Sequence, residues 1–155
     1  MPTNRHLEAA IGYLGLGMAS DAWEELEEID VAEGAKPEAL RVRVEVCRVL
    51  KKWKLMAELS SHLQTVEPDE AGHAVNLAWA TRRHQSIEAA EVILVAALRR
   101  HHDDALIRYN LACYWCVMGR VEDSRQMLES ACKKEKGLRE VARTDTDLAI
   151  LREGR

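Results

Sequence analysis

The amino-acid sequence predicts an all-α protein, a solenoid of four helix-turn-helix hairpins with a capping helix at its C-terminal end. Three observations support this fold class. The composition favours helix over strand, because alanine, leucine, glutamate and arginine are abundant, while only three prolines and no phenylalanine occur. Apolar residues recur at three- and four-residue spacing, the period of an amphipathic helix. The chain also repeats its pattern every 34 residues without a gap.

The repeat divides the chain into four rows, which cover residues 3–36, 37–70, 71–104 and 105–138. The eighth position of each row is small or apolar: Ala10, Val44, Ala78 and Ala112. So is the twentieth: Ala22, Met56, Ala90 and Ser124. The eighteenth position is polar throughout: Ser20, Lys54, Glu88 and Glu122. We therefore expect each row to form one helical hairpin, and the hairpins to stack, because one alone cannot bury its apolar stripe.

Local start and stop signals place the helices of the first two rows. In row one, Gly17 interrupts the apolar pattern and predicts the turn between two helices, while Gly34 predicts a helix end. In row two, Pro37 suits the first turn of a helix, where its missing N–H is not needed. Pro68, which acidic residues follow, predicts the end of the second helix of that row.

The last two rows carry comparable signals. Polar residues 84–86 break the helical pattern of row three, and Gly119 breaks that of row four. Asp103 and Asp104 are candidate N-caps for the first helix of row four. Gly137 is a candidate end for the second helix of that row.

Residues 139–153 predict the capping helix. A terminal repeat needs a lid whose inner side is apolar and whose outer side is polar. The apolar positions available for this purpose are Leu138, Val141, Leu148 and Leu151. We expect this helix to bend near residues 144–146.

The 34-residue period with small residues at the eighth and twentieth positions resembles the tetratricopeptide repeat (TPR) family. Row four carries the likeness best, through Leu111, Ala112, Trp115, Gly119, Leu128 and Ala131. Row three matches at Leu77, Ala78, Ala90, Leu94 and Ala97. The resemblance covers residues 3–138 and implies a right-handed superhelical solenoid that forms a single domain over residues 1–155. It also implies a non-catalytic protein-interaction module without a cofactor.

In the TPR family, the first helix of each hairpin lines a concave groove that binds a peptide or partner segment. Carried over by position, the groove residues are Arg41, Glu45, Arg48, Asn76, Trp79, Arg82, Arg83, Tyr109, Asn110 and Cys113. Arginine makes forked contacts with carboxylates, asparagine can hold a peptide backbone, and tryptophan and tyrosine are frequent at binding hot spots. We therefore expect a protein or peptide partner with acidic and apolar side chains.

Two alternatives to groove binding remain open. In the first, the arginines only pair with Glu38, Glu45 and neighbouring acids on a solvated face, where such pairs contribute about 0–1 kcal/mol each. In the second, the array is a structural subunit, or associates with itself, through its convex face or its ends. Trp23, on an outward-facing second helix, is either part of such a contact surface or buried against Met1 or Pro2.

Bulk properties exclude several classes of function. The formal net charge of -4 gives no drive toward nucleic acid or anionic lipid, which require a basic excess. No run of 18 apolar residues occurs, so we expect no transmembrane helix. The sequence contains no phosphate-binding loop, nucleophile elbow or HExxH motif, which argues against an enzyme. Four cysteines are too few for a disulfide scaffold, and we expect free thiols in a reducing cytoplasm.

Two groups of residues resemble metal or redox sites. Cys113 and Cys116 share one face of a helix, but a zinc site needs about four ligands and no second pair has suitable spacing. A run of two histidines and two aspartates, residues 101–104, lies at the junction between rows three and four, where turn residues and helix caps explain it more simply. We therefore expect no metal.

Overall fold

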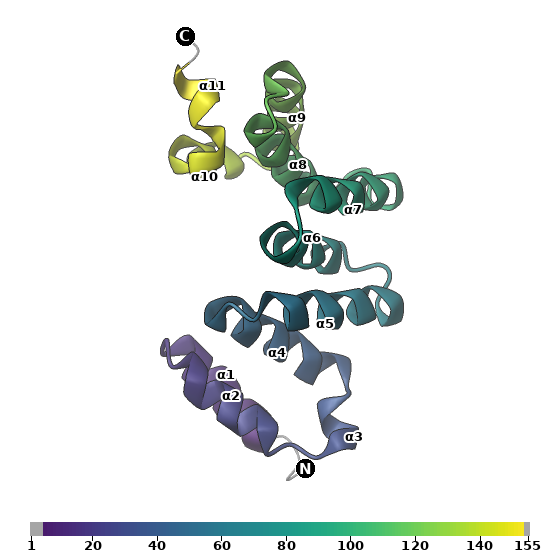
Figure 1. Cartoon of the computed structure of the whole chain (residues 1–155), viewed down its shortest axis with the longest axis vertical. Helices are drawn as coiled ribbons and strands as arrows, with labels where there is room; N and C mark the ends of the chain where they lie inside the picture. The colour runs from purple at the N-terminus through teal and green to yellow at the C-terminus, as the bar shows by residue number, and fades with distance from the viewer. Residues whose placement is uncertain (1–4, 154–155) are drawn as a thin grey trace. The chain divides into compact units, whose positions relative to one another are not determined.

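The computed structural model describes residues 5–153, where every regular element is a helix (Figure 1). The expected all-α fold is thereby confirmed. Contacts divide the chain into two compact units, Met1–Pro68 and Asp69–Arg155, and the boundary falls at the junction between rows two and three. Within residues 5–153, no helix combines the length and hydrophobicity that a membrane crossing requires.

Unit 1 contains two helical hairpins and one additional short helix. Its helices are α1 (Arg5–Gly15), α2 (Ala19–Glu27), α3 (Val31–Gly34), α4 (Pro37–Leu50) and α5 (Trp53–Val66). Pro37 begins α4, as expected. The turn between α1 and α2 has Gly17 at φ +76°, and Lys51 takes the same left-handed conformation, φ +60°, at the equivalent position of row two. Glycine accepts this conformation freely, whereas a side chain costs about 1–2 kcal/mol there.

The short helix α3 departs from the expected pattern of row one. The Asp30 side chain accepts a hydrogen bond from the Glu33 N–H at 2.9 Å and so caps a new helical turn. Gly34 ends this extra turn, whereas the second helix of the row ends already at Glu27. Gly34 therefore ends a helix, as predicted, but this helix is the extra turn α3 and not the second helix of the hairpin.

Unit 2 contains two helical hairpins and the C-terminal segment. Its helices are α6 (Gly72–His84), α7 (Ile87–Arg100), α8 (Ala105–Val117), α9 (Val121–Lys134), α10 (Leu138–Thr144), the 3-10 helix η2 (Thr146–Leu148) and α11 (Ala149–Glu153). Asp104 caps α8 by accepting from the Ile107 N–H at 2.8 Å, as expected, and Ser86 caps α7. Gly119 supplies the turn between α8 and α9 at φ +87°.

Equivalent positions of the four rows have equivalent environments. Every residue at the eighth and twentieth positions is buried, and every residue at the eighteenth is exposed. Ser124 shows why the twentieth position is small, since its hydroxyl donates a 2.6 Å hydrogen bond to the Ala112 carbonyl and ties α9 closely to α8. The repeat assigned from the sequence therefore describes how the hairpins pack.

The C-terminal segment is broken into three short helices. The expected bend is present at Asp145, where α10 ends and the chain enters η2. Leu138, Leu148 and Leu151 are buried in the core of unit 2, as a lid requires. Val141 is exposed, contrary to expectation, because α10 packs the face with Leu138 and Ala142 against the core, and Val141 lies outside that face. Gly137 precedes α10 and does not end α9, which stops at Lys134.

Candidate partner-binding site

The groove residues predicted in unit 1 lie along α4 and are largely exposed. Arg41 pairs with Glu67 at 2.5 Å, and Arg48 pairs with Glu45 one helical turn earlier at 3.2 Å. These are the pairings that the solvated-face alternative expects, and exposed pairs of this kind are weak and exchangeable. Two apolar side chains on the first helices of unit 1 are also exposed, Ile11 of α1 at 51% and Val49 of α4 at 54%.

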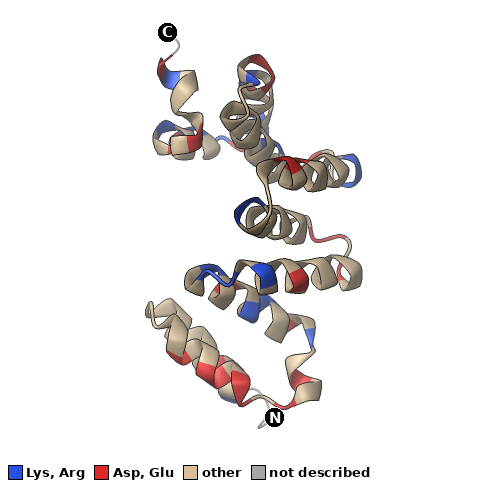
Figure 2. Ribbon diagram, viewed as in Figure 1, with Lys and Arg blue, Asp and Glu red and all other residues tan. Residues whose placement is uncertain are grey.

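The second helix of the first hairpin in unit 1 is acidic. Figure 2 shows acidic residues gathered on this hairpin, and most of them belong to α2. Trp23 on α2 is half-buried and lies between two cations of its own unit, with the Arg43 guanidinium 5.1 Å and the Lys52 ammonium 4.6 Å from its ring centroid. Cation–π contacts of this geometry account for an outward-facing tryptophan without a partner. The suggested burial against Met1 or Pro2 lies outside the described residues.

Four groove residues predicted in unit 2 lie on the first helices of its hairpins. Trp79 and Arg83 of α6 form a stack, with the guanidinium 3.6 Å from the ring centroid. Asn76 lies on the same helix, half-buried. Asn110 of α8 donates to the Leu106 carbonyl at 2.9 Å. These side chains form a polar and aromatic surface.

Arg82 is held by the chain's own C-terminal segment. Its guanidinium grips the Asp147 carboxylate with two hydrogen bonds, Nη1 to Oδ2 at 2.7 Å and Nη2 to Oδ1 at 3.0 Å. The side chains are only 20% and 25% exposed, so solvent screens this forked pair less than a surface pair. The bond to Asp147 is the main reason that the pKa of Arg82 is raised.

Tyr109 and Cys113 of α8 hold the other carboxylate of this segment. The Tyr109 hydroxyl donates to Asp145 Oδ2 at 2.7 Å, and the Cys113 thiol approaches the same oxygen at 3.5 Å. Burial first, and then the interaction with Asp145, raise the pKa of both the tyrosine and the thiol. Both groups therefore stay protonated at neutral pH and can act as donors to the carboxylate.

These three residues, Arg82, Tyr109 and Cys113, receive the C-terminal segment and donate hydrogen bonds to its carboxylates. We call them the acceptor site, meaning the site that accepts this segment. All three were predicted to lie in the groove, but their coverage by residues 145–148 was not predicted. For this stretch the sequence predicted only a bend in the capping helix. The available signal was the spacing of Asp145 and Asp147 ahead of Leu148, which matches a groove expected to prefer acidic and apolar side chains.

The acceptor site and its carboxylates also form the one potential metal cluster of residues 5–153, in which atoms of Cys113, Asp145 and Asp147 lie within 4.8 Å of one another. Each carboxylate already has a donor, and the Arg82 guanidinium places a positive charge against Asp147. A nearby fixed cation opposes binding of a metal ion. The cluster is best described as a hydrogen-bonded turn.

We expect the cysteine thiols to react slowly with iodoacetamide in the native protein. All four are buried and free, and burial raises the pKa of Cys47 to about 11. At pH 8 such a thiol is roughly 100-fold less ionised than an ordinary one, and only the thiolate reacts. Mass spectrometry should therefore show alkylation of Cys47 at least about 100-fold slower than in urea, and the other three buried thiols should also react more slowly in the native protein than in urea. Fast native labelling of Cys113 would contradict its coverage by residues 145–148.

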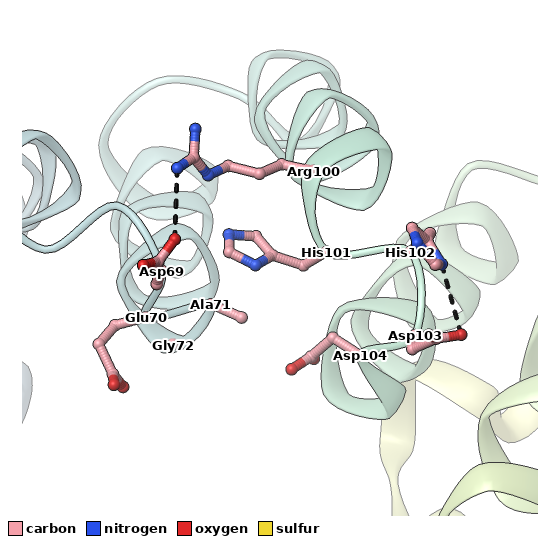
Figure 3. Close-up of a pocket in the computed structure, with 9 residues that line it drawn as sticks. All are labelled: Asp69, Glu70, Ala71, Gly72, Arg100, His101, His102, Asp103 and Asp104. Carbon is pink, nitrogen blue, oxygen red and sulfur yellow. Dashed lines mark hydrogen bonds and ion pairs between the residues drawn. The ribbon is translucent and has the colours of Figure 1, made fainter.

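The histidine-rich junction of unit 2 surrounds an open, polar hollow (Figure 3). Arg100 pairs with Asp69 at 3.4 Å across it, and Asp103 pairs with His102 at 3.4 Å and with Lys134 at 3.1 Å. Asp104 is occupied as the cap of α8. These contacts support the turn and cap roles expected from the sequence.

The comparisons with known proteins identify structural neighbours only. No protein-family model and no curated protein matches the sequence. MamA from Desulfovibrio magneticus RS-1, residues 41 to the end, is similar with a TM-score of 0.70 and 15% identity, over 86% of this chain and 76% of that one. The MamA RS-1 ArsTM double mutant has the same score and identity over 98% and 95%. MamA AMB-1 is similar with a TM-score of 0.68 and 17% identity over 99% and 84%.

These neighbours, at so low a sequence identity, establish the fold and leave the function to the chemistry of the chain's own residues. Their likeness covers most of the chain and agrees with the equivalent environments of the four rows. The chain therefore has the tetratricopeptide-type helical-repeat fold that its 34-residue period predicts.

Proposed function

We propose that this chain is a non-catalytic interaction scaffold, which binds an acidic segment of a partner protein on the inner faces of its first helices. The observation that carries this proposal is the acceptor site, where Arg82 and Tyr109 bind two aspartates of the turn at residues 145–148. The guanidinium and hydroxyl groups that bind carboxylates of the same chain can form the same hydrogen bonds with carboxylates of a partner protein.

The inner face of unit 1 supports the same chemistry. It carries Arg41 and Arg48 on α4, together with the exposed side chains of Ile11 on α1 and Val49 on α4. The acids that now pair with these arginines are partly exposed, so a partner carboxylate can replace them at little cost. The exposed apolar side chains would add affinity when a partner covers them. Free, buried thiols suit a reducing cytoplasm as the place where this scaffold acts.

Charge reversal on α4 tests this proposal. We expect the full-length double variant Arg41→Glu/Arg48→Glu to recover about tenfold less of its main partner from an extract of the native cells, since opposed like charges weaken an interface strongly. Quantitative mass spectrometry of tagged protein measures the recovery. Circular dichroism should be unchanged, because both arginines lie at the surface.

The matched control reverses two cations on second helices. Lys54→Glu/Arg99→Glu makes the same change in net charge at exposed positions of α5 and α7. It should retain the partner. If both variants recovered equally little partner, the partner would depend on the overall charge of the chain or on its convex face. That result would contradict binding on the inner face.

A further inference from the structure

The segment on the acceptor site has three recognition elements at fixed spacing. Asp145 accepts from Tyr109 and Cys113, and its second oxygen accepts from the Asp147 N–H at 3.0 Å, which shapes a tight turn. The turn directs Asp147 to Arg82. Leu148 follows at once and is buried.

The acceptor site is rigid, as a specific site must be. Arg82 lies over the Tyr114 ring with its guanidinium 5.2 Å from the centroid, and Tyr114 is buried in the core of unit 2. The stacked guanidinium is thus oriented before it meets a carboxylate. Leu148 and Leu151 enter the same core, whereas Thr146 and Ile150 point to solvent. The buried and bonded positions therefore read Asp-x-Asp-Leu-x-x-Leu.

We infer that the acceptor site is specific for segments of the class Asp-x-Asp-Leu-x-x-Leu, and that residues 145–151 are its resident ligand, which a partner segment of the same class must displace. This inference rests on the proposed function and names the partner chemistry of one part of it. The resident segment is tethered through α10, so its effective concentration is on the order of millimolar. A partner consequently binds only to the fraction of molecules whose site is open.

A synthetic peptide of residues 143–153 with a fluorescent label serves as the probe. We expect it to bind full-length Asp147→Asn protein at least tenfold more tightly than the wild-type chain, because this variant's own segment has lost its forked bond to Arg82 and competes less well. A peptide in which asparagine replaces the aspartate equivalent to Asp147 should bind the variant no more tightly than it binds the wild-type chain. Adding Arg82→Gln to the Asp147→Asn protein should also abolish the gain in affinity. Fluorescence anisotropy measures each affinity.

Alkylation supplies a second measurement that needs no peptide. In Asp147→Asn protein, the Cys113 thiol should be labelled several-fold faster than in wild type, because residues 145–148 leave the site more often. Cys116, fully buried on α8 of the same unit, should be labelled at an unchanged rate and so reports that the fold of unit 2 is intact. Equal peptide affinity for both proteins, or no binding to a variant whose Cys113 has become reactive, would overturn the inference.

The outcomes separate this inference from the proposed scaffold function. The peptide assay contains no partner protein and does not involve α4. If the peptide fails while Arg41→Glu/Arg48→Glu still loses its partner, only the specificity assigned to the acceptor site is wrong. If the peptide binds as expected and the α4 variant keeps its partner, binding on the inner face of unit 1 is wrong.

Discussion

Leu94→Ala should lower the free energy of unfolding of unit 2 by about 2–5 kcal/mol, the largest effect we expect from a single substitution. Leu94 is fully buried on α7, in the core where the two hairpins of unit 2 meet. Alanine removes apolar contact and leaves a cavity that rigid neighbouring helices fill only in part. Urea denaturation followed by circular dichroism measures the loss, and hydrogen exchange in α6–α9 assigns it to unit 2.

Val92→Ala is the matched control on the same helix. Val92 is 68% exposed, so its truncation should change stability by less than about 0.5 kcal/mol. Similar losses in the two variants would contradict packing between the hairpins as the source of the loss, because alanine has the higher helix propensity at both positions.

Arg82→Ala should destabilise unit 2 by about 1–2 kcal/mol and expose residues 145–151 to hydrogen exchange. The substitution leaves Asp147 without its forked donor while most of that carboxylate is shielded from water. The partial exposure of both side chains places the loss in the lower part of the range for charged hydrogen bonds. Arg82→Lys should restore only part of it, since an ammonium lacks the planar fork.

Arg100→Ala is the matched control, because it removes an ion pair that is exposed to solvent. The Arg100 side chain is 57% exposed and that of Asp69 is 97% exposed, so loss of this pair should cost less than about 0.5 kcal/mol. The exchange of residues 145–151 should stay as in wild type. Protection of that segment that survives Arg82→Ala would show that Leu148 and Leu151 alone hold it in place.

The packing of the hairpins could be predicted from the sequence because it is periodic. Ala78 and Ala112 are small for the same physical reason, the close approach of paired helices, and a repeated requirement leaves a repeated residue type. Caps such as Asp104 are local signals and could be read as well. The extra turn α3 was missed, although Asp30 three residues before Glu33 is a local cap of the same kind.

The acceptor site could be predicted only in part. Its helical half follows from position in the repeat, which placed Arg82, Tyr109 and Cys113 on the inner face. Its other half comes from residues 145–148, outside the repeat, and the contact between Arg82 and Asp147 spans 65 residues of sequence. No period relates such residues, and the bend at Asp145 that makes the contact possible depends on a hydrogen bond to the Asp147 N–H.

The contacts of the C-terminal segment also restrict how this array can grow. Asp147 binds Arg82 in row three, while Asp145 binds Tyr109 in row four. The segment can therefore make both contacts only where these two rows are consecutive. Duplication of row four would carry the segment one hairpin away from Arg82 and separate the two anchors. Duplication of any row ahead of row four would leave both anchors in register, because an Arg82 equivalent would still lie in the row before Tyr109. Lengthening by gene duplication is therefore compatible with these contacts only ahead of row four.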